Sequence, residues 1–304
     1  MTDSGYDNVR DAKGGFCAEG RAFTEHLWPL YAPYADSQFL REAKDNFTER
    51  FWEMYLGCSL LDRGFRIDTP GDEGPDLFAR IKRQRFWFEA TAPSGGTGAD
   101  RVPEPIEGKL GAVPEGQILL RLTAAIEAKR EHFERAAEKG IVAADEGAII
   151  CIDGRGIPNS ISDFEPHRIV KAVFPIGSDQ FTLDRKTMEV VDSGFEYRPH
   201  ITKTSGTEVP TTGFLDDRLR KISALIYSRV DCANHPLRMG DDFICVHNPK
   251  AERPLPIGFL GRGIEYWAEG DTLRYLEHNI ERGLFSRMTH RIGTCRARMR
   301  YASL

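Results

Sequence analysis

Apolar positions recur at helical spacing in residues 46–64. Steps of three and four place them on one side of a helix, and the residues concerned are Phe47, Phe51, Met54, Tyr55, Cys58, Leu60 and Leu61. Gly64 follows the last of them and predicts the helix end, because glycine readily adopts the left-handed conformation found there. The run at residues 65–68 then predicts a short first strand. Glu53 lies inside the predicted helix.

Two apolar-rich runs follow, and a polar pair separates them. The first run covers residues 74–82 and the second residues 85–91, with Arg83 and Gln84 between them. This pattern predicts a β-hairpin. Asp76 opens the first strand and Glu89 closes the second, so antiparallel pairing brings two carboxylates together. They repel unless a cation lies between them, and Mg²⁺ or Mn²⁺ with oxygen ligands meets that need. A surface hairpin with two solvated acids is the plainer interpretation.

A second helix is predicted over residues 117–139, after Pro114 and before Gly140. Its inward positions are Leu119, Leu122, Ile126, Phe133 and Ala137. Lys129 falls on the edge of this apolar stripe. A lysine there either extends its ammonium group to solvent or meets a buried anion. Residues 147–154 then predict a buried strand that ends in a turn.

The order of these elements resembles the PD-(D/E)xK nuclease superfamily. The resemblance covers residues 45–155, and Glu53, Asp76 and Glu89 match the helix acid, the Pro-Asp acid and the second acid of its motif. The motif expects a lysine two residues after the second acid, where this chain has Thr91. Some members carry that lysine on the following helix, and Lys129 is the candidate replacement. Extension of Lys129 to solvent remains the alternative.

The resemblance implies a restriction-endonuclease-like α/β fold, with a mixed central β-sheet flanked by helices. It also implies Mg²⁺- or Mn²⁺-dependent hydrolysis of phosphodiester bonds, with DNA as the expected substrate and RNA as the alternative. Asp76 and Glu89 would hold the metal, Glu53 would complete its shell or orient water, and Lys129 would stabilise the charge on the phosphate. Loss of the motif lysine also fits an inactive nuclease fold that binds nucleic acid or serves assembly. A scaffold that never contacts nucleic acid is a third hypothesis.

The rest of the chain gives weaker patterns. Residues 1–44 mix charges, glycines and aromatics and predict an N-terminal arm packed on the body, followed by the nuclease-like core at 45–155. Residues 181–184 and 188–191 predict a hairpin, and residues 195–203 and 243–249 predict strands. Residues 216–229 begin with a helical pattern, although 222–228 also fit a strand. We expect residues 156–304 to extend the central sheet and to end in a basic segment.

Composition limits how nucleic acid could bind. The chain has 304 residues and a formal net charge of −5, so binding requires a local basic face. One candidate is the hairpin tip, with Arg80, Lys82, Arg83 and Arg85. The other is near the C-terminus, with Arg282, Arg287, Arg291, Arg296, Arg298 and Arg300. Arginine forks suit phosphate oxygens, but solvated surface residues are the alternative for both clusters.

Cysteine spacing indicates free thiols in a reducing compartment. The six cysteines include no Cys-x-x-Cys pair. Cys232 with His235, and Cys245 with His247, have zinc-ligand chemistry but no second pair at zinc-site spacing, so packing roles are preferred. The sequence has no serine-hydrolase elbow, no His-Glu-x-x-His motif, no signal peptide and no apolar run long enough to span a bilayer. We therefore expect a soluble cytoplasmic protein with no membrane partner, and homo-oligomerisation stays open.

Overall fold

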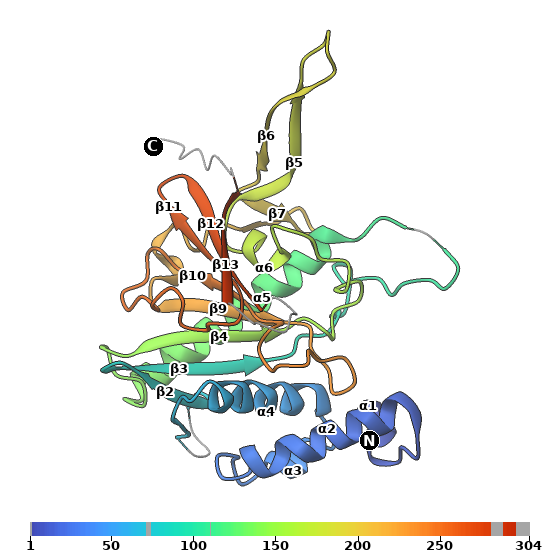
Figure 1. Cartoon of the computed structure of the whole chain (residues 1–304), viewed down its shortest axis with the longest axis vertical. Helices are drawn as coiled ribbons and strands as arrows, with labels where there is room; N and C mark the ends of the chain where they lie inside the picture. The colour runs from blue at the N-terminus through green and yellow to red at the C-terminus, as the bar shows by residue number, and fades with distance from the viewer. Residues whose placement is uncertain (1, 71–73, 110, 281–287, 296–304) are drawn as a thin grey trace.

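A mixed β-sheet lies at the centre of the molecule, seen here in a computed structural model that describes residues 2–70, 74–109, 111–280 and 288–295 (Figure 1). Within those residues the sheet has nine strands in the order β1-β2-β3-β4-β9-β10-β11-β12-β13. The strands are β1 (Ile67–Asp68), β2 (Leu77–Ile81), β3 (Gln84–Thr91), β4 (Gly147–Asp153), β9 (Ile222–Ser228), β10 (Ile244–His247), β11 (Gly263–Glu269), β12 (Thr272–Ile280) and β13 (Met288–Cys295). The predicted mixed sheet is confirmed.

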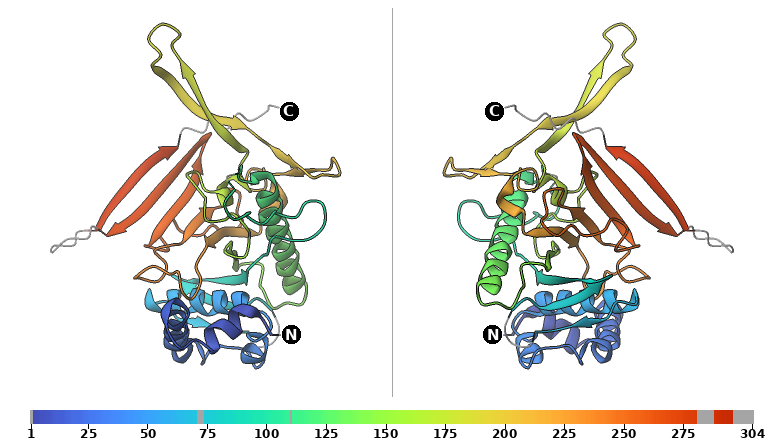
Figure 2. Two further views of the ribbon diagram at one scale, coloured as in Figure 1. Left: turned by 90° about the vertical axis from the view of Figure 1, so that its right-hand side faces the viewer. Right: turned by 90° about the vertical axis from the view of Figure 1, so that its left-hand side faces the viewer.

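Helices cover both faces of this sheet. On one face lie α5 (Glu115–Glu138) and the short α6 (Arg168–Lys171); on the other lies α4 (Phe47–Asp62), backed by α1 (Ser4–Arg10), α2 (Gly15–Tyr31) and α3 (Phe39–Glu42). Each face has its own hydrophobic core. Figure 2 shows α5 and the strands β11 and β12 on opposite sides of the molecule. Helix α2 packs on α4, so the first helices lie against the rest of the fold.

Helix α4 is buried all round because the sheet covers one side and α2 the other. Residues 51–60 are all buried, which explains why the apolar positions there are not confined to one stripe. Gly57 permits the close approach of α2, since a Cβ at this position would overlap the ring of Tyr31. This contact matters for the site, because Tyr31 also reaches Glu53.

The β2–β3 hairpin is confirmed, but its turn lies one residue earlier than predicted. Ile81 pairs with Gln84, so Lys82 and Arg83 form a two-residue turn, and Lys82 has a φ of 59°. Turns of this length need such left-handed backbone to match the twist of the strands. Glycine or asparagine usually supplies it. The predicted turn at Arg83 and Gln84 came instead from the polar pair between the two apolar-rich runs.

The expectation that every later segment extends the central sheet is wrong in part. Strands β9 to β13 do join it, and residues 222–228 form a strand after a short 3₁₀ turn at Asp217–Leu219. Among the residues that the structure describes, however, β5 (Ile176–Leu183) pairs only with β6 (Val190–Tyr197), and β7 (His200–Thr202) only with β8 (Glu208–Pro210). Most of β5 and β6 is exposed on both faces, so neither strand has a core-forming face, and the hairpin projects from the body (Figure 1).

The predicted C-terminal arginine cluster lies outside the described residues, apart from Arg291. The backbone of Arg291 belongs to β13, where it pairs with Glu277 of β12.

Candidate functional site

Asp76 and Glu89 meet at the open end of the β2–β3 hairpin. Leu77 pairs with Phe88, so the next step along the ladder sets Asp76 opposite Glu89. The backbone N–H of Asp76 donates to Glu89 Oε2 at 3.3 Å, and the N–H of Ala90 donates to Asp76 Oδ2 at 2.6 Å. Antiparallel pairing therefore fixes the two carboxylates side by side.

Helix α5 brings two cationic or proton-carrying groups to the same carboxylate. Lys129 Nζ lies 2.7 Å from Glu89 Oε1, and His132 Nδ1 lies 2.7 Å from the same oxygen. The two residues are three positions apart, so they share one face of the helix. Lys129 thus meets a buried anion and does not extend to solvent, which settles the alternative left open by the sequence.

Glu53 occupies the opposite wall of the site, where α2 and α4 hold both of its oxygens. Tyr31 donates its hydroxyl to Oε1 at 2.6 Å, and the Arg50 guanidinium contacts Oε2 at 2.5 Å. Burial raises the pKa of Glu53 above its usual range, although Arg50 and Tyr31 oppose that shift. The carboxylate is therefore already paired, unlike that of Asp76.

A cavity of about 360 Å³ lies beside this cluster. Asp76, Glu53, Arg50 and His132 are among its lining residues. Burial raises the pKa of Asp76 well above its usual range, and the charges of Glu89 and Glu53 raise it further. In the part of the chain that the structure describes, no ion pair joins Asp76 to a basic side chain. Asp76 is thus the carboxylate in this cavity that most needs a cation.

Lys129 and His132 have the opposite effect on the pKa of Glu89. Burial alone would raise the pKa of Glu89, but the hydrogen bond from His132 and the charge of Lys129 lower it below its usual range. Conversely, the pKa of Lys129 is raised, because attraction to Glu89 and Asp76 outweighs the effect of burial. Glu89 is therefore held as a carboxylate and Lys129 as an ammonium ion.

The structure brings the four predicted residues to one site, but the three carboxylates do not converge on a single metal position. Asp76, Glu89 and Lys129 are in direct contact, whereas Glu53 shares only the cavity. Among the described residues, a different group has three ligand atoms that all lie within 4.8 Å of one another. The predicted three-acid metal shell is therefore not preassembled, and Mg²⁺ binding stays a prediction.

That other group could hold a metal ion and consists of Cys245, His247 and Glu265, all buried. The first two lie on β10 and the third on β11, in a parallel register that sets Cys245 beside Glu265. The sequence favoured packing roles for Cys245 and His247, because it has no second Cys or His pair at zinc-site spacing. Nothing in the sequence pattern indicated that Glu265 lies beside them. A Cys-x-His pattern in a strand, which puts both side chains on one face, was the available signal.

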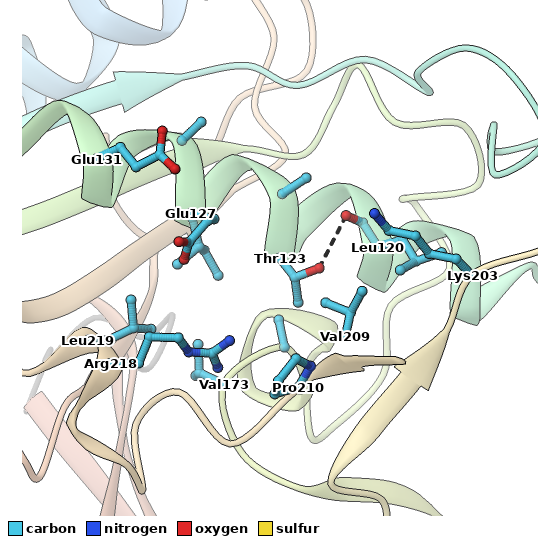
Figure 3. Close-up of a pocket in the computed structure, with 14 residues that line it drawn as sticks. Leu120, Thr123, Glu127, Glu131, Val173, Lys203, Val209, Pro210, Arg218 and Leu219 are labelled. Atoms are coloured by element: carbon cyan, nitrogen blue, oxygen red, sulfur yellow. Dashed lines mark hydrogen bonds between the residues drawn. The ribbon is translucent and has the colours of Figure 1, made fainter. Parts of the chain in front are cut away.

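A second cavity, of about 390 Å³, lies on the outer side of α5 (Figure 3). Thr123, Glu127 and Glu131 of α5 form one wall, and Val209 and Pro210 face them across the cavity. Glu127 is already paired with Arg130 at 2.6 Å, and the pocket brings together no acid pair like that of Asp76 and Glu89. We therefore place the candidate site on the sheet side of α5.

The basic hairpin tip lies away from this site. Lys82 and Arg83 are at the turn, whereas Asp76 and Glu89 are at the other end of the hairpin. Glu89 lies five residue steps along the strand from Gln84, which corresponds to about 17 Å. Arg85 is also committed, since it pairs with Glu146 at 3.0 Å and stacks on Phe78. The tip could contact a long substrate but not the reacting group.

Three residues that complete the site were not predicted from the sequence. His132 lies three residues after Lys129, so the helical spacing that identified the lysine also predicts this histidine. Tyr31 and Arg50 were harder to find. Tyr31 comes from an N-terminal segment with no clear relation to the core, and Arg50 looks like an ordinary solvated charge.

Among the described residues, none of the helices has the length and apolar character needed to cross a membrane. Comparison of the chain with models of known protein families found no match, and comparisons with curated proteins and with solved structures found none either.

Proposed function

We propose that the protein is a metal-dependent hydrolase of phosphodiester bonds, with DNA as the first substrate to test. The observation that carries the proposal is the contact between three groups: Asp76 beside Glu89, and Lys129 against Glu89. Two neighbouring acids with an ammonium group in contact with one of them are the side chains that hydrolysis of a phosphodiester at a metal site requires. The resemblance to the PD-(D/E)xK superfamily points to the same reaction, with Lys129 replacing the motif lysine that is missing at Thr91.

The donor atoms fit a hard divalent cation. Asp76 and Glu89 offer only oxygens, and Mg²⁺ and Mn²⁺ prefer oxygen ligands. The raised pKa of Asp76 reflects burial and unbalanced negative charge, which a cation at Asp76 and Glu89 would neutralise. When bound, such an ion would hold a phosphate oxygen and lower the pKa of a coordinated water. Glu53, paired with Arg50 and Tyr31, would position neighbouring groups or water.

Lys129 and His132 have separate tasks in this proposal. Lys129 is kept charged by Glu89 and Asp76, so it can stabilise the extra negative charge that develops on the phosphate. His132 is partly exposed and lines the cavity. Its ring can accept a proton from water or donate one to the leaving oxygen.

The test is an incubation of the purified chain with supercoiled plasmid, single-stranded DNA and RNA, in Mg²⁺ or Mn²⁺. We expect cleavage by the wild type and its loss in Glu89→Gln. Asp68→Asn is the matched control, because Asp68 is an exposed acid on neighbouring β1. Equal cleavage by Glu89→Gln and wild type would refute the proposed site.

One observation favours a second function, that of an inactive nuclease fold used for binding or assembly. Glu89 Oε1 is already shared by Lys129 and His132, and Glu53 is neutralised by Arg50. Most of the charge at the site is thus balanced from within, as in a structural network. This second function predicts that the wild type cleaves none of the three substrates but still binds at least one of them.

A further inference from the structure

A cluster of metal-ligating side chains is buried on β10, β11 and β12, and β10 is the third strand from β3 in the sheet order. Cys245 and Glu265 are 0% exposed and His247 is 5% exposed. Cys245 Sγ lies 3.6 Å from His247 Nε2, and the same nitrogen lies 2.8 Å from Glu265 Oε2. Three chemically different ligand atoms therefore converge in the interior.

The spacing of the thiol and imidazole matches a zinc site. With Zn–S of about 2.3 Å and Zn–N of about 2.0–2.1 Å, a tetrahedral ion separates the two ligand atoms by about 3.5–3.6 Å. The distance in the structure is 3.6 Å. The gap between His247 Nε2 and Glu265 Oε2 is a hydrogen-bond distance, about 0.5 Å shorter than the corresponding tetrahedral edge of about 3.3 Å. Small side-chain rotations are enough to admit the ion.

The other ring nitrogen of His247 is oriented as in metal-bound histidines. Its Nδ1 lies 3.2 Å from the carbonyl oxygen of Leu255, and a carbonyl can only accept, so Nδ1 carries the hydrogen. Such a bond fixes the ring and directs Nε2 toward a metal. Nε2 faces both the carboxylate of Glu265 and the thiol of Cys245. A proton on Nε2 would bind only the carboxylate, whereas a metal ion there would bind both groups.

Glu265 has the surroundings of a ligand carboxylate that is held in place. Gly258 donates its N–H to Oε2 at 2.9 Å, and His278 Nε2 lies 2.9 Å from Oε1. The residue is therefore an oriented anion in a fully buried position, which is costly unless cations balance it.

We propose that Cys245, His247 and Glu265 bind one Zn²⁺ ion, a site separate from the one that the hydrolase proposal uses. Mixed sulfur, nitrogen and oxygen ligands suit Zn²⁺ and not Mg²⁺. The ion joins β10 to β11 and, through Leu255 and Gly258, fixes the connection between them. Three protein ligands leave the fourth position of a tetrahedral ion to water, and His278 on β12 orients the ligand carboxylate.

The competing account is a metal-free ion pair, in which protonated His247 and His278 balance Glu265. That account gives the Cys245 thiol no part. Substitution of the thiol therefore distinguishes the two: Cys245→Ser removes a ligand from a zinc site but leaves an ion pair intact.

The test measures metal in the full-length protein after chelation and return of Zn²⁺. We expect one equivalent per chain, and an affinity at least about 100-fold lower in Cys245→Ser and Glu265→Gln. Cys58→Ser is the matched control, since Cys58 is a buried thiol that donates to the Leu27 carbonyl. Asp76→Asn should bind Zn²⁺ like the wild type, which separates this site from the hydrolytic one.

Co²⁺ substitution gives a second readout that needs no variant to fold. Co²⁺ in the wild type should show tetrahedral d–d bands and a thiolate-to-metal charge-transfer band in the near ultraviolet. A wild type that takes up neither metal, a Co²⁺ spectrum without the thiolate band, or loss of Zn²⁺ in Asp76→Asn would each overturn the zinc site. A wild type without metal uptake, or without the thiolate band, would leave the hydrolase proposal untouched, whereas loss of Zn²⁺ in Asp76→Asn would place the metal at the hydrolytic site.

Discussion

Lys129 Nζ lies 2.7 Å from Glu89 Oε1, although 40 positions separate the two residues in the chain. One residue belongs to the middle of a sheet and the other to the helix that covers it. The pair places an ammonium ion beside a carboxylate that also neighbours Asp76. If the site cleaves phosphodiesters, this lysine occupies the role that Thr91 cannot fill.

Replacement of Lys129 by methionine should lower the cleavage rate by about 10²–10³-fold, the usual effect of losing one group that stabilises transition-state charge. It should also lower the free energy of unfolding by about 1–3 kcal/mol, because Glu89 loses a charged partner. Single-turnover kinetics and urea unfolding measure the two effects. Arg135→Met is the control, since Arg135 is an exposed cation on the same helix. Equal rates for the two variants would remove Lys129 from the mechanism.

Glu53 and Asp76 should differ in importance, although the sequence assigned both to the metal. Glu53 is already held by Tyr31 and Arg50, so Glu53→Gln should slow cleavage by about 10–100-fold, as for a residue that positions others. Asp76→Asn should cost about 10³-fold or more. Metal titrations of the rate compare them. A larger loss in Glu53→Gln than in Asp76→Asn would reverse the assignment.

Much of the structure of residues 45–155 could be predicted because its signals are local. The helix containing Glu53, the hairpin and the helix containing Lys129 each have a clear apolar period and a clear stop. The register of the hairpin was less accessible, since Lys82 adopts a left-handed conformation that favours glycine or asparagine. The predicted turn would have set Asp76 opposite Thr91, two residues from its partner in the structure.

Contacts between distant segments explain what the sequence could not give. Glu265 reaches Cys245 only through the parallel pairing of β10 with β11, and nothing in either segment alone indicates its partner. Tyr31 reaches Glu53 because Gly57 lets two helices approach. Strands β5 and β6 were recognised as a hairpin, but whether a hairpin joins the main sheet depends on a core-forming face that these strands lack.

Gly263 should resist substitution more than another glycine with a similar backbone conformation. It has a φ of +65°, and a Cβ there would overlap the carbonyl oxygen of Phe243 where β11 begins beside β10. Gly263→Ala should therefore lower the free energy of unfolding by about 3–5 kcal/mol. Gly270→Ala is the control, because Gly270 has a φ of +62° and open space around it; it should cost about 1–2 kcal/mol. Chemical denaturation measures both, and equal costs would contradict the predicted overlap.

Asp153 should make the protein less stable as the pH rises. Burial raises the pKa of its carboxyl well above the usual range, with the charges of Asp242 and Asp231 adding to the shift. Its Oδ2 is buried without a hydrogen-bond partner. Below the pKa of the unfolded chain, about 4, the group is protonated in both states and has no effect. Above it, folding must keep the proton or bury the charge, so stability falls until the pH passes the folded pKa.

Asp153→Asn tests that sign, since asparagine does not titrate. The free energy of unfolding of the variant, minus that of the wild type, should be more positive near pH 7.5 than near pH 4, the ordinary aspartate range. Urea unfolding at the two pH values provides the comparison. A difference that is constant or falls with pH would show that Asp153 is not held in its protonated form.

The most direct test of the proposed hydrolase is the single-turnover rate of plasmid cleavage over a Mg²⁺ titration, in the wild type and in Asp76→Asn. The account predicts a wild-type rate that rises with Mg²⁺ and saturates. At every concentration the rate of the variant should be lower by a factor of about 10³ or more. Matching rates in the two proteins, or cleavage by the wild type that does not depend on the metal, would contradict it.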